Sequence, residues 1–83
     1  MKTKKVIFDV IKKHLLSNCP WISEHEIELK ARLTNDLDLD SCELCELIIE
    51  LQEVYSVTIH DNRRNSWKTI NDIVEDVYQL INK

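Results

Sequence analysis

Ser41, Cys42 and Cys45 are the residues of this chain whose types and spacing could support chemistry. Asp40 precedes the serine, and Glu43 follows Asp40 by three positions, which is the spacing of a reciprocal helix capping box. This spacing places Ser41 at the first helical position, where its hydroxyl is not used for capping. A phosphate on that hydroxyl would lie beside unpaired N–H groups and the positive end of the helix dipole. Ser41 is therefore a candidate attachment point, although a small polar residue that merely starts a helix is the simpler interpretation.

The residues after Ser41 predict a helix with a buried face that extends to Tyr55. At about 100° per residue, one side collects the apolar residues Leu44, Leu47, Ile48, Leu51, Val54 and Tyr55. A neighbouring stripe carries Glu43, Glu46, Glu50 and Glu53, and the side directed away from the core carries Cys42, Cys45 and Ile49. Between Asp36 and Glu53 there are seven acidic residues and no Lys or Arg. Such a run is often only a solvated face, but beside small apolar groups it favours a docking surface for basic partners.

This stretch resembles the acyl carrier protein family. The resemblance depends on the run DLDLDSC at 36–42, on the acidic leucine-rich run at 46–53, and on Tyr55 and Ile59, and it covers about residues 6–81. It implies that Ser41, flanked by Asp40, accepts a 4'-phosphopantetheine arm from coenzyme A through a phosphopantetheinyl transferase. It also implies that the chain carries acyl or aminoacyl groups as thioesters, and that partner enzymes perform the chemistry.

Three positions depart from the family pattern, two of them near the serine and the third farther along the chain. Asp38 occupies the place of a glycine, Cys42 that of a leucine, and His60 that of a proline. The leucine position is, by the resemblance, a contact for the transferase and other partners. The substitution at Cys42 therefore bears on which enzymes recognise this chain.

The partner surface implied by this reading is the exposed side of the helix that follows Ser41. It consists of Cys42, Glu43, Cys45, Glu46, Ile49, Glu50 and Glu53. We expect it to fit basic patches on acyl-transferring or acyl-activating enzymes, as a helix in a groove. Carriers for fatty acids, for polyketides or peptides, and for a single amino acid all remain open. An alternative of a different class is a cofactor-free helical interaction module.

Composition agrees with an all-α fold. The 83 residues include no glycine and one proline, so helices should dominate. We expect a single domain over 1–83, with 1–3 frayed, folded as a small four-helix bundle of the acyl carrier type. Such a bundle has three main helices, one short helix and a long first loop. The net charge of −4 argues against nucleic-acid binding. No apolar run reaches the ~20 residues that span a membrane, so we expect a cytoplasmic protein. We also expect it to be a monomer.

Four further segments complete the predicted bundle. Apolar residues at helical spacing predict a first helix over 4–17, with Val6, Ile7, Val10, Ile11, His14 and Leu15 on its apolar stripe. A long connection over 18–39 should lie against the helices through Trp21, Ile22, Ile27, Leu29, Leu33, Leu37 and Leu39, with a helical turn or two in 24–32. A short helix is expected within 61–66. Thr69 with Asp72 should cap a final helix that ends near Ile81.

Other candidate sites receive less support. Cys42 and Cys45 form a C-x-x-C pair, but the βαβ pattern that accompanies dithiol redox chemistry is absent. The pair could join Cys19 and a histidine around zinc, yet free thiols in a reducing compartment are the simpler interpretation. The acidic run at 36–40 begins like a calcium loop and lacks the glycine and glutamate that the loop requires later. We expect no metal site, and we find no nucleophile–base pair of an enzyme.

Overall fold

The computed structural model describes residues 3–82, and within them it contains five helical segments and no β-strand. In chain order these are α1 (Lys4–Asn18), the 3₁₀ helix η1 (Glu24–Glu26), α2 (Ser41–Tyr55), the 3₁₀ helix η2 (Asp61–Ser66) and α3 (Ile70–Ile81). The predicted all-α bundle is confirmed, with three main helices, a short helix before the last one and a long first loop. None of the helices in residues 3–82 has the length and apolar character that a membrane crossing requires.

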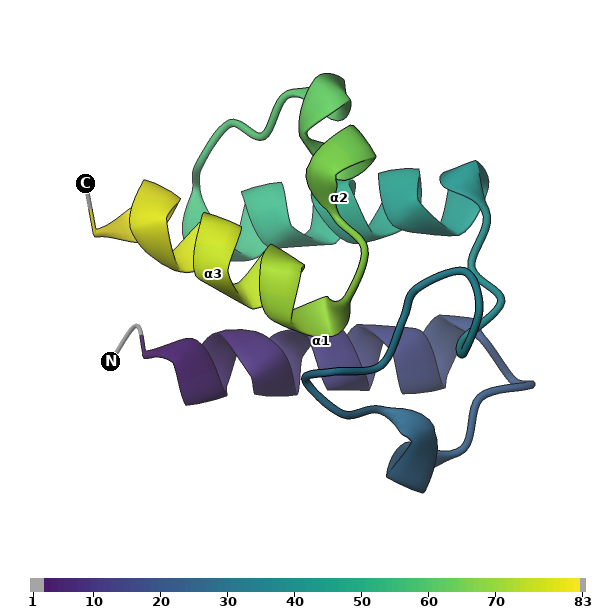
Figure 1. Ribbon diagram of the computed structural model, residues 1–83. Helices are drawn as coiled ribbons and strands as arrows, with labels where there is room; N and C mark the ends of the chain where they lie inside the picture. The colour runs from purple at the N-terminus through teal and green to yellow at the C-terminus, as the bar shows by residue number, and fades with distance from the viewer. Residues whose placement is uncertain (1–2, 83) are drawn as a thin grey trace.

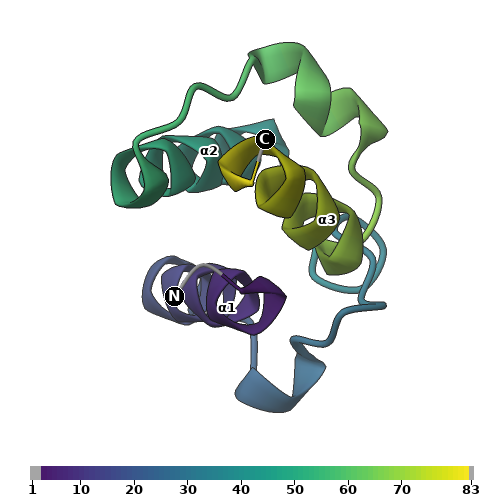
Figure 2. The ribbon, with the colours of Figure 1, turned by 90° about the vertical axis from the view of Figure 1, so that its left-hand side faces the viewer.

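The three α-helices surround one hydrophobic core, as the end-on view in Figure 2 shows. The helix residues buried there are Ile7, Ile11, Leu15, Leu47, Ile48, Leu51, Tyr55, Ile70, Ile73, Val74 and Val77. In Figure 1, η2 lies above α2 and leads down to α3, while the start of α1 and the end of α3 lie on one side of the molecule. The N-terminal end of α2 lies on the opposite side.

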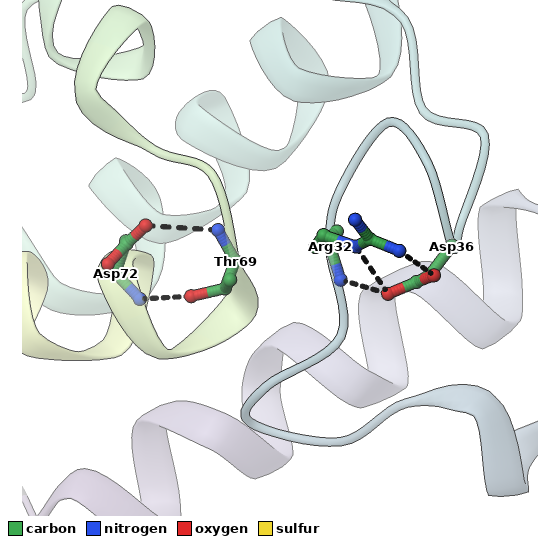
Figure 3. Close-up of polar contacts among 4 residues, drawn as sticks. All are labelled: Arg32, Asp36, Thr69 and Asp72. Carbon is green, nitrogen blue, oxygen red and sulfur yellow. Dashed lines mark hydrogen bonds and ion pairs between the residues drawn. The ribbon is translucent and has the colours of Figure 1, made fainter.

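Side-chain caps start α1 and α3. The Thr3 hydroxyl accepts a hydrogen bond from the Val6 N–H at 3.3 Å. The predicted cap of α3 is confirmed, because Thr69 Oγ1 accepts from the Asp72 N–H at 3.3 Å and the Asp72 carboxylate accepts from the Thr69 N–H at 3.0 Å (Figure 3). Fraying was expected for residues 1–3, but Thr3 is part of the first helix cap, and residues 1–2 lie outside the described residues.

The long loop between α1 and α2 is bonded to the chain that precedes α3. Three backbone N–H groups donate across this junction: Leu33 to the Lys68 carbonyl (2.9 Å), Ile70 to that of Ala31 (3.1 Å) and Asn71 to that of Leu29 (2.8 Å). Arg32 and Thr69 form an isolated antiparallel bridge there. The loop is therefore held against α3 by backbone hydrogen bonds and does not depend on apolar contacts alone. Its only regular element in the described range is η1, at the low end of the helical content expected for 24–32.

Four apolar residues that were expected to be buried are exposed instead: Val6 (39%), Trp21 (49%), Leu29 (48%) and Val54 (46%). Val54 lies at the edge of the apolar arc of α2, about 60° from its centre, where the packing of the other helices leaves it open to solvent. The Trp21 side chain is bonded to the loop although half of it is exposed: its ring N–H donates to the Leu37 carbonyl at 3.0 Å. Hydrophobic periodicity identifies the face of a helix, whereas the width of the covering elements decides which edge residues are buried.

Candidate functional site

Ser41 is the first residue of α2 and is exposed. The predicted capping box before it is confirmed: the Asp40 carboxylate accepts from the Glu43 N–H at 3.0 Å, and the Glu43 carboxylate accepts from the Asp40 N–H at 2.8 Å. The Ser41 hydroxyl makes no hydrogen bond to any residue within 3–82. Capping is carried out by its neighbours, so this hydroxyl is available for reaction.

The capping box also sets the charge beside Ser41. The Glu43 N–H, followed by the Glu43 side chain, holds the pKa of Asp40 below its usual value. The Asp40 N–H lowers the pKa of Glu43, but the Asp40 side chain, burial, and repulsion from Asp40 and Glu46 outweigh it and leave that pKa raised. Asp40 is therefore the carboxylate of this pair that holds its negative charge more firmly, and it adjoins the serine.

The loop that leads to Ser41 is ordered by its own backbone. The Leu39 N–H donates to the Leu33 carbonyl at 2.9 Å, and both leucine side chains are buried. Asp38 adopts a left-handed backbone with a φ of 54°, and its N–H donates to the Thr34 carbonyl at 3.1 Å. The family's glycine position thus keeps the left-handed geometry that glycine favours, with an aspartate in its place. Backbone hydrogen bonds within the loop therefore fix the chain that leads into Ser41.

Most of the expected partner surface faces solvent along α2. Cys42, Glu46, Ile49, Glu50 and Glu53 are exposed, with Ile49 at 53%. Glu43 is half-buried because its carboxylate is engaged in the capping box. Among residues 3–82, none of these glutamates lies within 4.0 Å of a Lys, Arg or His nitrogen. The negative charge along this face is therefore not neutralised within the described part of the chain.

Cys45 differs from the expectation that it faces solvent. It is half-buried beside η2, and its Sγ accepts a hydrogen bond from Nη1 of Arg64. Sequence reasoning missed Arg64, because nothing in the pattern of 61–66 shows that η2 folds back onto α2. The only available signal was the pair of arginines in a short polar segment between two predicted helices.

The remaining cysteines do not assemble with Cys45. Cys19 is buried, and burial raises the pKa of its thiol, whereas Cys42 is exposed. Within residues 3–82 no three or more His, Cys, Asp or Glu side chains are grouped in a way that could hold a metal ion.

Comparison with known proteins relates the chain to carriers along most of its length. No protein-family model matches it. The chain is 37% identical over 62 residues to the acyl carrier protein of Phytoplasma australiense, which covers 75% of this chain and 82% of that protein. It is 31% identical over 80 residues to the acyl carrier protein of Petrotoga mobilis, an alignment that covers 96% of this chain and 93% of that protein. It is 30% identical over 77 residues to the acyl carrier protein of Clostridium perfringens, with 93% of this chain and 100% of that protein covered.

Proposed function

This chain belongs to the acyl carrier protein family, and from that premise we propose that it carries acyl or aminoacyl groups on a 4'-phosphopantetheine arm attached to Ser41. The single observation that carries the proposal is the exposed Ser41 hydroxyl, which has no hydrogen bond within residues 3–82 and follows a loop closed by its own backbone. The relatives support an acyl carrier role for the family as a whole.

The residues around Ser41 fit the arm. Asp40 and Glu43 hydrogen-bond to each other and leave the Ser41 hydroxyl without a partner within residues 3–82. The positive end of the helix dipole at the first turn of α2 would stabilise a phosphate on that hydroxyl. Attachment joins Ser41 Oγ to the pantetheine phosphorus of coenzyme A as the pyrophosphate bond breaks. Adenosine 3',5'-bisphosphate leaves, and the hydroxyl proton passes to a base of the transferase. When bound, the arm supplies a terminal thiol that holds acyl groups as thioesters.

The chain itself then contributes binding and positioning, and catalysis belongs to its partners. The docking face consists of Cys42, Glu46, Ile49, Glu50 and Glu53, with the half-buried Glu43 at its edge. Cys45 is left out of the expected face, because it is half-buried beside η2 and accepts a hydrogen bond from Arg64. The glutamates of this face, which form no ion pair within residues 3–82, complement basic patches on transferases and on acyl-transferring or acyl-activating enzymes. Such contacts form quickly, weaken with salt and allow the carrier to leave each partner. The proposed setting is fatty-acid, polyketide or related biosynthesis in the cytoplasm, where coenzyme A and its transferases are found.

Intact mass tests this proposal. The purified chain is incubated with coenzyme A and a broad-specificity phosphopantetheinyl transferase. We expect wild type and Ser17→Ala, which removes another exposed helical serine, to gain the mass of one phosphopantetheine, and Ser41→Ala to gain nothing. Absence of any gain with several transferases would favour the alternative, a cofactor-free module that binds basic grooves through α2.

A further inference from the structure

We propose that Arg64 binds the phosphate through which the arm is joined to Ser41. This inference rests on the proposed function, because it assigns a residue to the group that the function requires. The evidence is the placement of Arg64 relative to α2, the weakness of its present contacts and the charge around Ser41.

The placement follows from the packing of η2 on α2 (Figure 1). Nη1 of Arg64 donates to Sγ of Cys45, which fixes the guanidinium on the first turns of α2. Cys45 follows Ser41 by four residues, so the two side chains lie on the same side of the helix, rotated by about 40° and with Cβ atoms about 6 Å apart. The free oxygens of a phosphate on Ser41 lie two bonds beyond Oγ, which brings them within reach of the guanidinium.

Arg64 has hydrogen-bonding capacity left for such a ligand. A guanidinium carries five N–H donors, and a neutral thiol is a weak acceptor. No carboxylate within residues 3–82 lies within 4.0 Å of Arg64, whereas its neighbour Arg63 is paired with Asp76. A phosphate oxygen would therefore be a stronger acceptor than the one Arg64 contacts at present.

The surroundings of Ser41 make a nearby cation useful. Asp38 and Asp40 precede the serine, and the glutamates of α2 follow it without an ion pair in the described part of the chain. A negatively charged phosphodiester is repelled by these carboxylates. Arg64 is the one basic side chain that makes a hydrogen bond or ion pair to α2 among residues 3–82. It would offset this repulsion and hold the root of the arm beside η2, while the thiol end stays free.

The test compares each variant with and without the arm, so that effects on the bare fold cancel. Wild type, Arg64→Gln and the matched control Arg63→Gln are converted with coenzyme A and a transferase, and conversion is checked by intact mass. We expect attachment to raise the melting temperature of wild type and Arg63→Gln by about 2–5 °C, and to leave that of Arg64→Gln nearly unchanged. The ³¹P resonance of the phosphodiester should shift in Arg64→Gln and stay in place in Arg63→Gln.

The outcomes separate this inference from the function beneath it. If wild type gains no mass, the proposed function fails and this inference fails with it. If all three proteins are modified and Arg64→Gln shows the same temperature shift and ³¹P resonance as wild type, the inference is overturned and the function stands. If wild type is modified but Arg64→Gln is not, Arg64 serves the transferase contact and the inference is likewise overturned.

Discussion

The carboxylate of Asp36 accepts a hydrogen bond from the backbone N–H of Arg32 at 2.7 Å, and this contact closes the turn that leads toward Ser41 (Figure 3). The Arg32 guanidinium lies beside the same carboxylate, with Nε 3.4 Å from Oδ2. The backbone bond first, and the side-chain contact second, hold the pKa of Asp36 below its usual value. The turn before the serine therefore depends on an ionised aspartate.

Asp36→Asn should destabilise the chain in a pH-dependent way. Because the folded pKa of Asp36 is lowered, the contribution of its carboxylate is fully present above the usual pKa of 3.8 and is lost as the pH falls through the lowered folded value. We expect wild type to melt above Asp36→Asn by a constant margin from pH 8 to about 5, and the margin to close below about pH 4. Thermal unfolding across this range measures it, with Asp9→Asn as the control for loss of one carboxylate. A margin that widens toward acid would refute the argument.

Asp38 adopts a φ of 54°, at a position where a Cβ atom is unfavourable. We expect Asp38→Gly to match or exceed the wild-type free energy of unfolding, and Asp38→Ala to fall about 1 kcal/mol below the glycine variant. Urea denaturation gives the order. Ser56, with a φ of 53° at the end of α2, provides a second left-handed site, and Ser56→Gly should likewise match or exceed the wild-type free energy of unfolding. Equal stability of Asp38→Gly and Asp38→Ala would show that the turn relaxes out of this geometry.

The Tyr55 hydroxyl is buried at the end of α2 and has no hydrogen-bond partner within residues 3–82. Burial also raises its pKa. Tyr55→Phe removes the unpaired polar atom and keeps the ring, so the free energy of unfolding should rise by about 1 kcal/mol. Tyr78→Phe, which alters a half-buried ring under the Lys4 ammonium, should change it little. A loss of stability in Tyr55→Phe would mean that the hydroxyl has a partner, such as an internal water.

Glu46→Lys tests the docking face without touching the core. Glu46 is exposed and unpaired within residues 3–82, so the unfolding free energy should change by less than about 0.5 kcal/mol. Its kcat/KM with a phosphopantetheinyl transferase should fall about 10-fold, and added salt should narrow the gap to wild type. Glu28→Lys makes the same charge change in the loop before α2 and serves as the matched control. Equal losses in both variants would point to net charge and not to the face.

The helices and their caps could be predicted from the chain because their causes are local. Asp40 with Glu43, and Thr69 with Asp72, lie three residues apart, and short-range spacing is enough to place a helix start. The buried residues of α2 follow from the same periodicity, except that Val54 is exposed and Leu44 is only half-buried.

The structural features that could not be predicted from the sequence are those that depend on contacts between distant segments of the chain. Arg64 meets Cys45 only because η2 folds back over α2, nineteen positions further along the chain. The left-handed backbone at Asp38 arises from the way the loop closes, and an aspartate there gives little sign of it. The unpaired hydroxyl of Tyr55 depends on what the core leaves beside it. Spacing in one dimension does not determine such relationships.

The start of α1 and the end of α3 lie on the side of the molecule opposite the start of α2, and this placement has a practical consequence (Figure 1). A fluorophore, an affinity handle or a second protein fused at either end would project from the far side. Tethered to a bead or a sensor surface in this way, the molecule would present Ser41 outward. Binding of enzymes could then be followed in real time on an oriented layer.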